Sequence, residues 1–322
     1  MPTVLITGGH TGIGFECAKQ LAGMYHLDLV LAGRNVEIIE GAARELRAAY
    51  GVQVHVIELD TASLVSVRQA ASQCRALVKQ GAIDVLQALV CNAGAQFHGP
   101  ISYSPDGYER TFATNFLGHY LLVELLFDLI AAQGRVVFTA SGTHDPETTD
   151  GKMVGKAVEP DAVALANDGK DGATALTPGV RYSTSKLCTI MHAYELDRRL
   201  RREGSSVLSI AFDPGSVPET GLLREMPAAV RWLAKTGAMK WMMGRMGVTL
   251  GSIGVSGAGL AQVAADPVFA DASGRYIQSK NGRIVRAESS KISNDKARAI
   301  KLWNDCKTLV ALQPDEEPRQ LQ

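Results

Sequence analysis

The chain has 322 residues, of which 46% are hydrophobic, and its 33 basic residues balance its 33 acidic ones. A protein without net charge lacks the excess of positive charge by which proteins hold nucleic acids. A chain this apolar buries enough surface to fold, which excludes intrinsic disorder. The five cysteines are scattered and never spaced as CxxC, and the first residues lack the pattern of a secretory leader. These features predict reduced thiols, no metal site and a cytoplasmic protein.

Short apolar runs alternate with longer helical patterns over most of the chain. We expect strands at residues 3–7, 27–32, 52–57, 85–90, 135–139 and 206–212, and helices at 12–24, 36–50, 63–79, 115–132 and 181–202. Unbroken apolar strands separated by helices are typical of a parallel sheet that is covered on both faces. The pattern therefore predicts a doubly wound α/β fold of the Rossmann type, with residues 1–322 forming a single domain.

Three stretches do not fit this alternation. Residues 142–180 are rich in turn-forming and acidic residues, and we expect a surface insert beside the active site, in which His144 is a solvated loop histidine. Residues 217–248 hold five of the nine methionines and two of the three tryptophans. Residues 280–322 form a C-terminal extension, in which a polar segment leads into an amphipathic helix near residues 293–310.

The segment 217–248 has more than one interpretation. Methionine and tryptophan provide adaptable apolar surface, which suits a helical lid over a hydrophobic substrate. The segment also carries five basic residues against two acidic residues, which suits peripheral contact with a membrane or a protein partner. An ordinary pair of packed helices is the third alternative.

The loop after the first strand is rich in glycine. Glycines at positions 8, 12 and 14 permit a tight turn, close approach of the backbone to a pyrophosphate, and close packing of the next helix. The start of that helix offers unpaired N–H groups to phosphates. An ordinary loop is the alternative, but the position between the first strand and the first helix favours a dinucleotide site. The candidate cofactor ligands here are Gly8, His10, Thr11, Gly12, Ile13 and Gly14.

The end of the second strand indicates which dinucleotide is bound. Enzymes that use NAD usually place an acidic residue here, whereas this chain has Arg34 followed by Asn35. A guanidinium group suits the 2′-phosphate of NADP(H), and His10 can add a second donor. NADP(H) is therefore the predicted cofactor, with a solvated arginine as the alternative.

Two further strand ends belong to the same predicted site. Asp60 and Thr61 follow the third strand, where they can hold an adenine ring. Asn92, Ala93 and Gly94 follow the fourth strand and form a corner of small residues against the cofactor. Each of these groups, taken alone, is also typical of a helix cap or a turn.

The residues with the clearest chemistry are Tyr182 and Lys186. They are four positions apart, so on a helix they share one face. A free phenol has a pKa near ~10, and a neighbouring ammonium group lowers it toward neutral pH. Ser141 ends the fifth strand at the edge of the sheet where such folds bind ligands, and Asn115 begins a long helix.

This set of motifs resembles the classical branch of the short-chain dehydrogenase/reductase family, over nearly the whole chain. The resemblance implies that Tyr182 is the catalytic acid/base and that Ser141 orients a substrate carbonyl. It also implies that Lys186 holds the nicotinamide ribose, that Asn115 supports a proton relay, and that Pro214 and Gly215 contact the cofactor.

Residues 214–216, 220–225, 260–267 and 302–310 resemble one branch of the family more closely. This is the branch of light-dependent protochlorophyllide reductases and retinol dehydrogenase-like enzymes. One departure is Ser216, where the photoenzymes have a cysteine. The resemblance therefore implies an NADPH-dependent oxidoreductase that transfers hydride to a carbonyl or conjugated enone of a hydrophobic small molecule. The alternatives are light-dependent reduction of a tetrapyrrole double bond and a non-catalytic NADP(H)-binding redox sensor. A homo-oligomer is also expected by resemblance.

Overall fold

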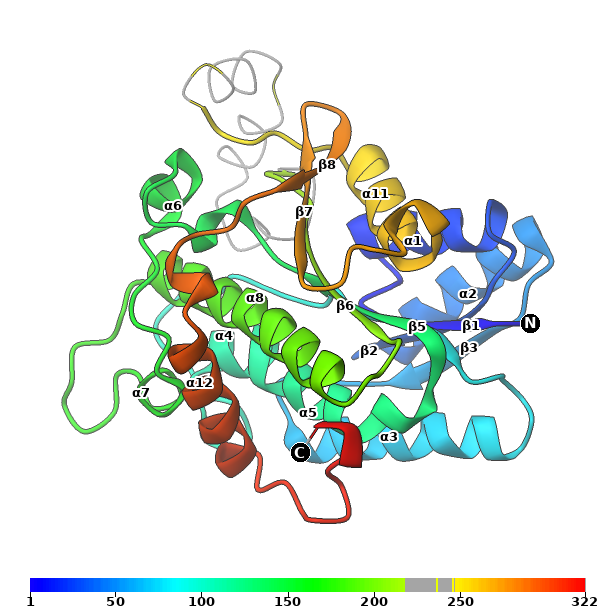
Figure 1. Ribbon diagram of the computed structural model, residues 1–322, viewed down its shortest axis with the longest axis horizontal. Helices are drawn as coiled ribbons and strands as arrows, with labels where there is room; N and C mark the ends of the chain where they lie inside the picture. The colour runs from blue at the N-terminus through cyan, green and yellow to red at the C-terminus, as the bar shows by residue number, and fades with distance from the viewer. Residues whose placement is uncertain (218–235, 237–244, 246, 322) are drawn as a thin grey trace.

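The computed structural model describes residues 1–217, 236, 245 and 247–321, and its strands form one eight-stranded sheet (Figure 1). The strand order is β3-β2-β1-β4-β5-β6-β7-β8, with all neighbours parallel except β7 and β8. The strands are β1 (Thr3–Thr7), β2 (Asp28–Gly33), β3 (Val54–Glu58), β4 (Leu86–Cys91), β5 (Ile130–Thr139), β6 (Leu208–Asp213), β7 (Arg275–Lys280) and β8 (Arg283–Ala287). The order reverses between β1 and β4, and at such a switch point the crevice at the carboxyl ends of the strands binds ligands.

Helices cover both faces of this sheet. The α-helices are α1 (Gly12–Gly23), α2 (Val36–Tyr50), α3 (Leu64–Lys79), α4 (Arg110–Phe112), α5 (Gly118–Leu126), α6 (Thr149–Val154), α7 (Ala162–Ala166), α8 (Pro178–Arg202), α11 (Ile253–Ala265) and α12 (Lys296–Leu309). A π-helical turn, η1 (Ala113–Leu117), joins α4 to α5, and the short 3₁₀ turns are η2 (Phe127–Leu129), η3 (Gly142–His144), η5 (Pro267–Phe269), η6 (Ile292–Asn294) and η7 (Arg319–Leu321).

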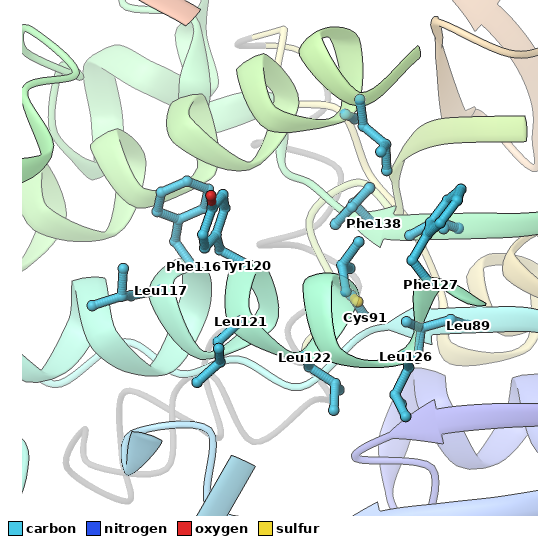
Figure 2. Packing of buried hydrophobic residues seen from close by; sticks show 14 of the residues in the cluster. Leu89, Cys91, Phe116, Leu117, Tyr120, Leu121, Leu122, Leu126, Phe127 and Phe138 are labelled. Carbon is cyan, nitrogen blue, oxygen red and sulfur yellow. The ribbon is translucent and has the colours of Figure 1, made fainter. Parts of the chain in front are cut away.

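The core has two parts because neighbouring residues of a strand point to opposite faces. In β1, Val4 and Ile6 pack with α1, α2 and α11, whereas Leu5 packs with α3, α5 and α8 on the other face. Figure 2 shows the second part, in which the apolar side chains of η1 and α5 lie against those of β4 and β5. The prediction of a doubly wound Rossmann-type fold is confirmed, and it explains why the inner strands are apolar throughout.

Some predicted boundaries differ from the structure. The helix expected at 115–132 begins earlier, at Arg110, and β5 already begins at Ile130. Pairing of Ile130 with Leu86 on β4 overrides the helical preference of the alanines that follow.

The short helices α6 and α7 of the insert were not predicted, nor were α11, β7 and β8. β7 and β8 form a hairpin whose tip, Asn281-Gly282, has φ values of 52° and 75°, so the Asn-Gly pair was a usable hairpin signal. Since β8 belongs to the sheet, the start of the stretch 280–322 is part of the core fold.

The boundaries of the insert 142–180 and of the lid stay predictions. Most of the lid segment 217–248 lies outside the described residues. Among the described helices, none combines the length and the apolar character that crossing a bilayer requires.

Candidate active site

A cavity of about 560 Å³ opens at the carboxyl ends of the strands, at the switch between β1 and β4. It is lined by the loop after β1, the ends of β2 to β6, the start of α6 and the first turns of α8. The predicted site residues on its wall are Gly8, His10, Thr11, Gly12, Ile13, Gly14, Arg34, Asn35, Asp60, Thr61, Asn92, Ala93, Gly94, Ser141, Tyr182, Lys186, Pro214 and Gly215. The fold therefore brings the predicted cofactor residues and the predicted chemical groups into one space.

The glycine-rich turn needs its glycines for two reasons. Gly8 and Gly12 have φ values of 68° and 55°, which residues with a side chain rarely adopt. A Cβ on Gly14 would lie 2.4 Å from the carbonyl oxygen of Gly8, so any side chain there would displace the turn. Thr11 caps α1 without a side-chain hydrogen bond, which leaves the first amides of the helix available for a phosphate.

A network of hydrogen bonds ties the ends of three strands together beneath this turn. The hydroxyl oxygen of Thr7 accepts from the backbone N–H groups of Asn92 and Ala93, at 2.9 Å in both cases. The Asn92 amide donates to the carbonyl of Thr7 at 3.0 Å and accepts from the Thr139 hydroxyl at 3.3 Å. Sequence reasoning missed Thr7 and Thr139, because a threonine that ends a strand has no distinctive spacing.

The residues after β2 divide into two roles. The side chain of Asn35 accepts from the backbone N–H of Ile38 at 3.1 Å and so caps α2, whereas Arg34 is exposed at the cavity edge. Nδ1 of His10 is buried without a hydrogen-bond partner among the described residues. Burial lowers the pKa of His10, and the positive charge of Arg34 lowers it further, so this ring is uncharged at neutral pH. The charge at this end of the cavity therefore comes from Arg34.

Asp60 is in part a local structural residue. Its carboxylate accepts from the backbone N–H of Ala62 at 3.0 Å and so shapes the turn that precedes α3. Asp60 still lines the cavity, as does Thr61, which is buried. The two interpretations of Asp60, a turn residue and a cavity residue, therefore both hold.

Tyr182 and Lys186 lie on the first turns of α8 and are 5% and 4% exposed. Nζ of Lys186 donates to the carbonyl oxygen of Thr139 at 2.8 Å and lies 5.8 Å from the centre of the Tyr182 ring. Burial lowers the pKa of Lys186 to about 8. Burial also raises the pKa of Tyr182 to about 12, although its hydrogen bond with Ser141 acts in the opposite direction. The Tyr182 phenol is therefore protonated at neutral pH. Its hydrogen-bond partner Ser141 lines the same cavity, so both groups can face a substrate.

Comparison with known proteins agrees with this geometry. Residues 2–149 match the family model described as short chain dehydrogenase. The chain is 31% identical over 327 residues to a chloroplastic protochlorophyllide reductase A from Oryza sativa subsp. japonica, over 96% of this chain and 80% of the rice protein. It is 29% identical over 320 residues to the chloroplastic short-chain dehydrogenase TIC 32 A of Brassica napus, over 97% of this chain and 89% of that protein.

This chain belongs to the short-chain dehydrogenase/reductase family. Its resemblance to the protochlorophyllide reductase branch is confirmed by the same matches. Among solved structures, a short chain dehydrogenase from Burkholderia cenocepacia J2315 in complex with NADP superposes with a TM-score of 0.62 and 22% identity, over 87% of this chain and 97% of the other. The protein is therefore an oxidoreductase by family.

The prediction of a cytoplasmic location is wrong. Relatives of this short-chain dehydrogenase/reductase that match 94% to 97% of the chain are named as chloroplastic proteins. The prediction depended on free cysteines, and all five are unpaired and buried. Such thiols are compatible with any reducing compartment, so they do not distinguish the cytoplasm from an organelle.

Asn115 differs from the other predicted site residues of this family member, because it does not line the cavity. It lies in the π-helical turn η1 and is 2% exposed. Its side chain accepts from the backbone N–H of Ala95 at 2.8 Å and donates to the carbonyl of Ala95 and the hydroxyl of Ser185. Asn115 thus fixes the loop after β4 and the helix of Tyr182 from behind.

The prediction that His144 is a solvated loop residue is wrong. Its ring is 2% exposed, Nδ1 lies 2.8 Å from the carbonyl oxygen of Ser141, and Nε2 accepts from the backbone N–H of Ser290 at 3.0 Å. His144 therefore anchors the serine of the active site to the C-terminal part of the chain.

The remaining wall of the cavity has a mixed character. Its apolar side chains are Phe97, Met153, Val154, Val217 and Val248. Its polar groups include Gln96, Thr143, Asp150, Asp213 and Thr249. None of these residues was predicted individually, although several belong to the insert 142–180, which was expected beside the active site, or to the ends of the segment 217–248.

Proposed function

We propose that this protein is an NADPH-dependent oxidoreductase that transfers hydride to a carbonyl, or to a conjugated enone, of a hydrophobic small molecule. The observation that carries the proposal is the placement of Tyr182, Lys186 and Ser141 on the wall of the same cavity as the glycine-rich turn and Arg34. The family membership and the dinucleotide complexes among similar folds support it.

The residues at the β1 and β2 ends fit NADP(H). The turn from Gly8 to Gly14 provides backbone N–H groups without side chains in the way, as a pyrophosphate requires. Arg34 offers the donors that a 2′-phosphate needs, and the unpaired nitrogen of His10 offers one more. When bound, NADPH supplies the hydride.

Tyr182 is proposed to give the proton to the substrate. A phenol that burial keeps protonated is ready to act as an acid, and Ser141 stabilises the developing oxyanion by hydrogen bonding. Lys186, held by the carbonyl of Thr139, provides positive charge on the same helix face and so stabilises the phenolate that is formed. The apolar side chains of the wall, which include Phe97 and Met153, favour a hydrophobic substrate.

A screen for NADPH oxidation tests this proposal. Aromatic ketones, quinones, retinoid-like aldehydes and enones are offered in the dark, and absorbance of NADPH is followed with the wild-type protein and with Tyr182→Phe. We expect oxidation by the wild type and at least a hundredfold slower oxidation by the variant, since general acid catalysis contributes about 10²–10⁴-fold. Equal rates in the two proteins would refute the role of Tyr182.

Light-dependent reduction of a tetrapyrrole double bond is the second candidate, because protochlorophyllide reductases are among the relatives at 31% identity. Incubation with protochlorophyllide and NADPH in the dark and under illumination separates the candidates. Turnover that requires light would favour the second. Binding of NADPH without any turnover would favour a redox sensor instead.

A further inference from the structure

Asp213 is a buried carboxylate beside the active site that sequence reasoning did not identify. It is the last residue of β6, is 0% exposed, and contributes to the wall of the cavity. Tyr276 and Gln278 on β7 each donate to one carboxylate oxygen at 2.8 Å, and the backbone N–H of Gly215 donates to the other at 2.8 Å. Three donors thus converge on this carboxylate inside the protein, the arrangement that suits a negative charge.

The sheet places Asp213 on the strand beside the residue that anchors Lys186. The ammonium group of Lys186 donates to the carbonyl oxygen of Thr139 on β5, and Thr139 pairs with Phe212 on β6. Thr139, which accepts from Lys186, therefore pairs with the residue directly before Asp213. The two neighbouring strands lie only about 4.8 Å apart. Lys186 and Asp213 line the same cavity.

We propose that Asp213 is a positioning residue that acts as the buried counter-charge of Lys186 and holds it as an ammonium ion. The inference rests on the proposed function for its catalytic meaning, although the pairing itself can be tested without turnover. A buried ammonium ion is costly unless a negative charge compensates it. Asp213 raises the pKa of Lys186 against the larger effect of burial, and it also raises the pKa of Tyr182. Both effects favour the charged lysine and the protonated phenol, the states required to reduce a carbonyl.

The other groups around Lys186 do not replace this charge. Burial lowers the pKa of His119 on α5 to about 4, and Lys186 lowers it as well, so this ring is neutral. Asn115 of η1 and Ser141 after β5 are uncharged. Asp150 of α6 lines the cavity next to Asp213, but its carboxylate accepts from the backbone N–H of Thr249 at 3.3 Å, and burial raises its pKa.

His144 and Tyr276 complete the surroundings on the side of η3 and β7. Burial lowers the pKa of His144, and burial raises the pKa of Tyr276. Both rings are therefore neutral at physiological pH. Among the described residues that face this part of the cavity, Asp213 is thus the carboxylate whose charge acts on Lys186.

A purely structural role for Asp213 makes a different prediction. The hydrogen bonds to Gly215, Tyr276 and Gln278 also hold the turn after β6 and join β6 to β7. If that were the whole role, a variant would lose stability and activity by the same factor at every pH. A counter-charge instead predicts an effect that depends on pH through Lys186.

Equilibrium unfolding in urea from pH 6 to pH 10 measures the titration of Lys186 without turnover. Burial lowers the pKa of Lys186 in the folded protein, whereas in the unfolded chain a lysine keeps its proton up to about pH 10.4. Between these two pKa values the unfolded chain binds more protons than the folded protein, so the free energy of unfolding rises with pH. The difference between the wild type and Lys186→Met isolates this rise, which we expect to begin near the folded pKa of about 8. The same difference is then taken between Asp213→Asn and the double variant that carries both Asp213→Asn and Lys186→Met. Without the Asp213 carboxylate, the rise in stability should begin about one pH unit lower.

Asp150→Asn is the matched control, since it removes a neighbouring carboxylate of the same wall and should leave the onset where the wild type has it. Asp213→Ser, which keeps an acceptor for the N–H of Gly215, serves the same comparison should Asp213→Asn not fold. An unchanged onset in the Asp213 variants would overturn the proposal, as would an equal displacement in Asp150→Asn.

Reductase assays then connect the pairing to catalysis. With a substrate from the screen, the ratio of kcat/KM in Asp213→Asn to that in the wild type should be about fivefold lower at pH 8 than at pH 6. A loss that is the same at both pH values would contradict the counter-charge. Absence of turnover in the wild type would refute the proposed function, while the unfolding experiment would still decide on Asp213.

Discussion

The two ends of the cavity are built in different ways. At the cofactor end, the turn from Gly8 to Gly14 follows one strand and opens one helix, so a single continuous segment makes the phosphate site. At the chemical end, each important contact joins distant parts of the chain. Lys186 bonds to Thr139, Asp213 bonds to Tyr276, and the histidine behind the active-site serine bonds to Ser290.

The match to the family model covers mainly the cofactor end of the cavity. The family model matches residues 2–149, which contain the cofactor end and Ser141, and stops before Tyr182. The C-terminal part of the chain supports the chemical end, because β7 supplies Tyr276 and Gln278 as donors to Asp213, and Ser290, after β8, donates to His144. Changes at the cofactor end should therefore weaken NADPH binding strongly, whereas changes at Tyr182 and His144 should alter reactivity or stability with little effect on binding.

The largest effect on this comparison is expected from Gly14→Ala. The added Cβ would lie 2.4 Å from the carbonyl oxygen of Gly8 and 2.6 Å from Nδ2 of Asn92, so the turn must shift. We expect NADPH affinity, measured by fluorescence titration, to fall by about a hundredfold. Gly41→Ala in α2 is the control, because the only atom within 4 Å of its added Cβ is the end of the Arg44 side chain at 4.0 Å. Unchanged binding in Gly14→Ala would contradict the assigned role of the turn.

A smaller effect is expected from Arg34→Ala. Loss of a charge-assisted hydrogen bond to the 2′-phosphate should weaken NADPH binding by about 30-fold and leave NADH binding unchanged. Arg44→Ala, at another exposed arginine of the neighbouring helix α2, should alter neither affinity. Equal weakening of both nucleotides by Arg34→Ala would show that this arginine does not select NADP(H).

At the chemical end, His144→Leu should change stability rather than binding. The substitution leaves the buried N–H of Ser290 without its acceptor, whereas the carbonyl of Ser141 keeps its hydrogen bond from the backbone N–H of position 144. The free energy of unfolding, measured in urea, should fall by about 2 kcal/mol, while NADPH affinity stays within a factor of about two. A tenfold loss of NADPH affinity would show that the two ends are not separable.

How much the sequence could predict follows from the same difference. The glycine turn, Arg34 and the pair Tyr182 and Lys186 were predictable, because their spacing within one element decides their placement. Asp213 was not, because its importance depends on the register that sets β6 beside β5 and β7.

Two details depend on contacts between distant parts of the chain. Asn115 was expected to support a proton relay, which stays a prediction, and its side chain lies behind the cavity wall, where it bonds to Ala95 and Ser185. His144 was predicted to be solvated, but its acceptor nitrogen is occupied by Ser290, far along the chain. A local sequence pattern carries no information on contacts between residues that lie far apart in the chain.

The most direct test of the central claim is the comparison of binding and chemistry in Tyr182→Phe. NADPH affinity is measured by fluorescence titration, and hydride transfer by single-turnover oxidation of bound NADPH with the best substrate of the screen. The account predicts an affinity within about threefold of the wild type and a hydride-transfer rate that is at least about a hundredfold lower. Hydride transfer at the wild-type rate in this variant would contradict the assignment of Tyr182 as the acid.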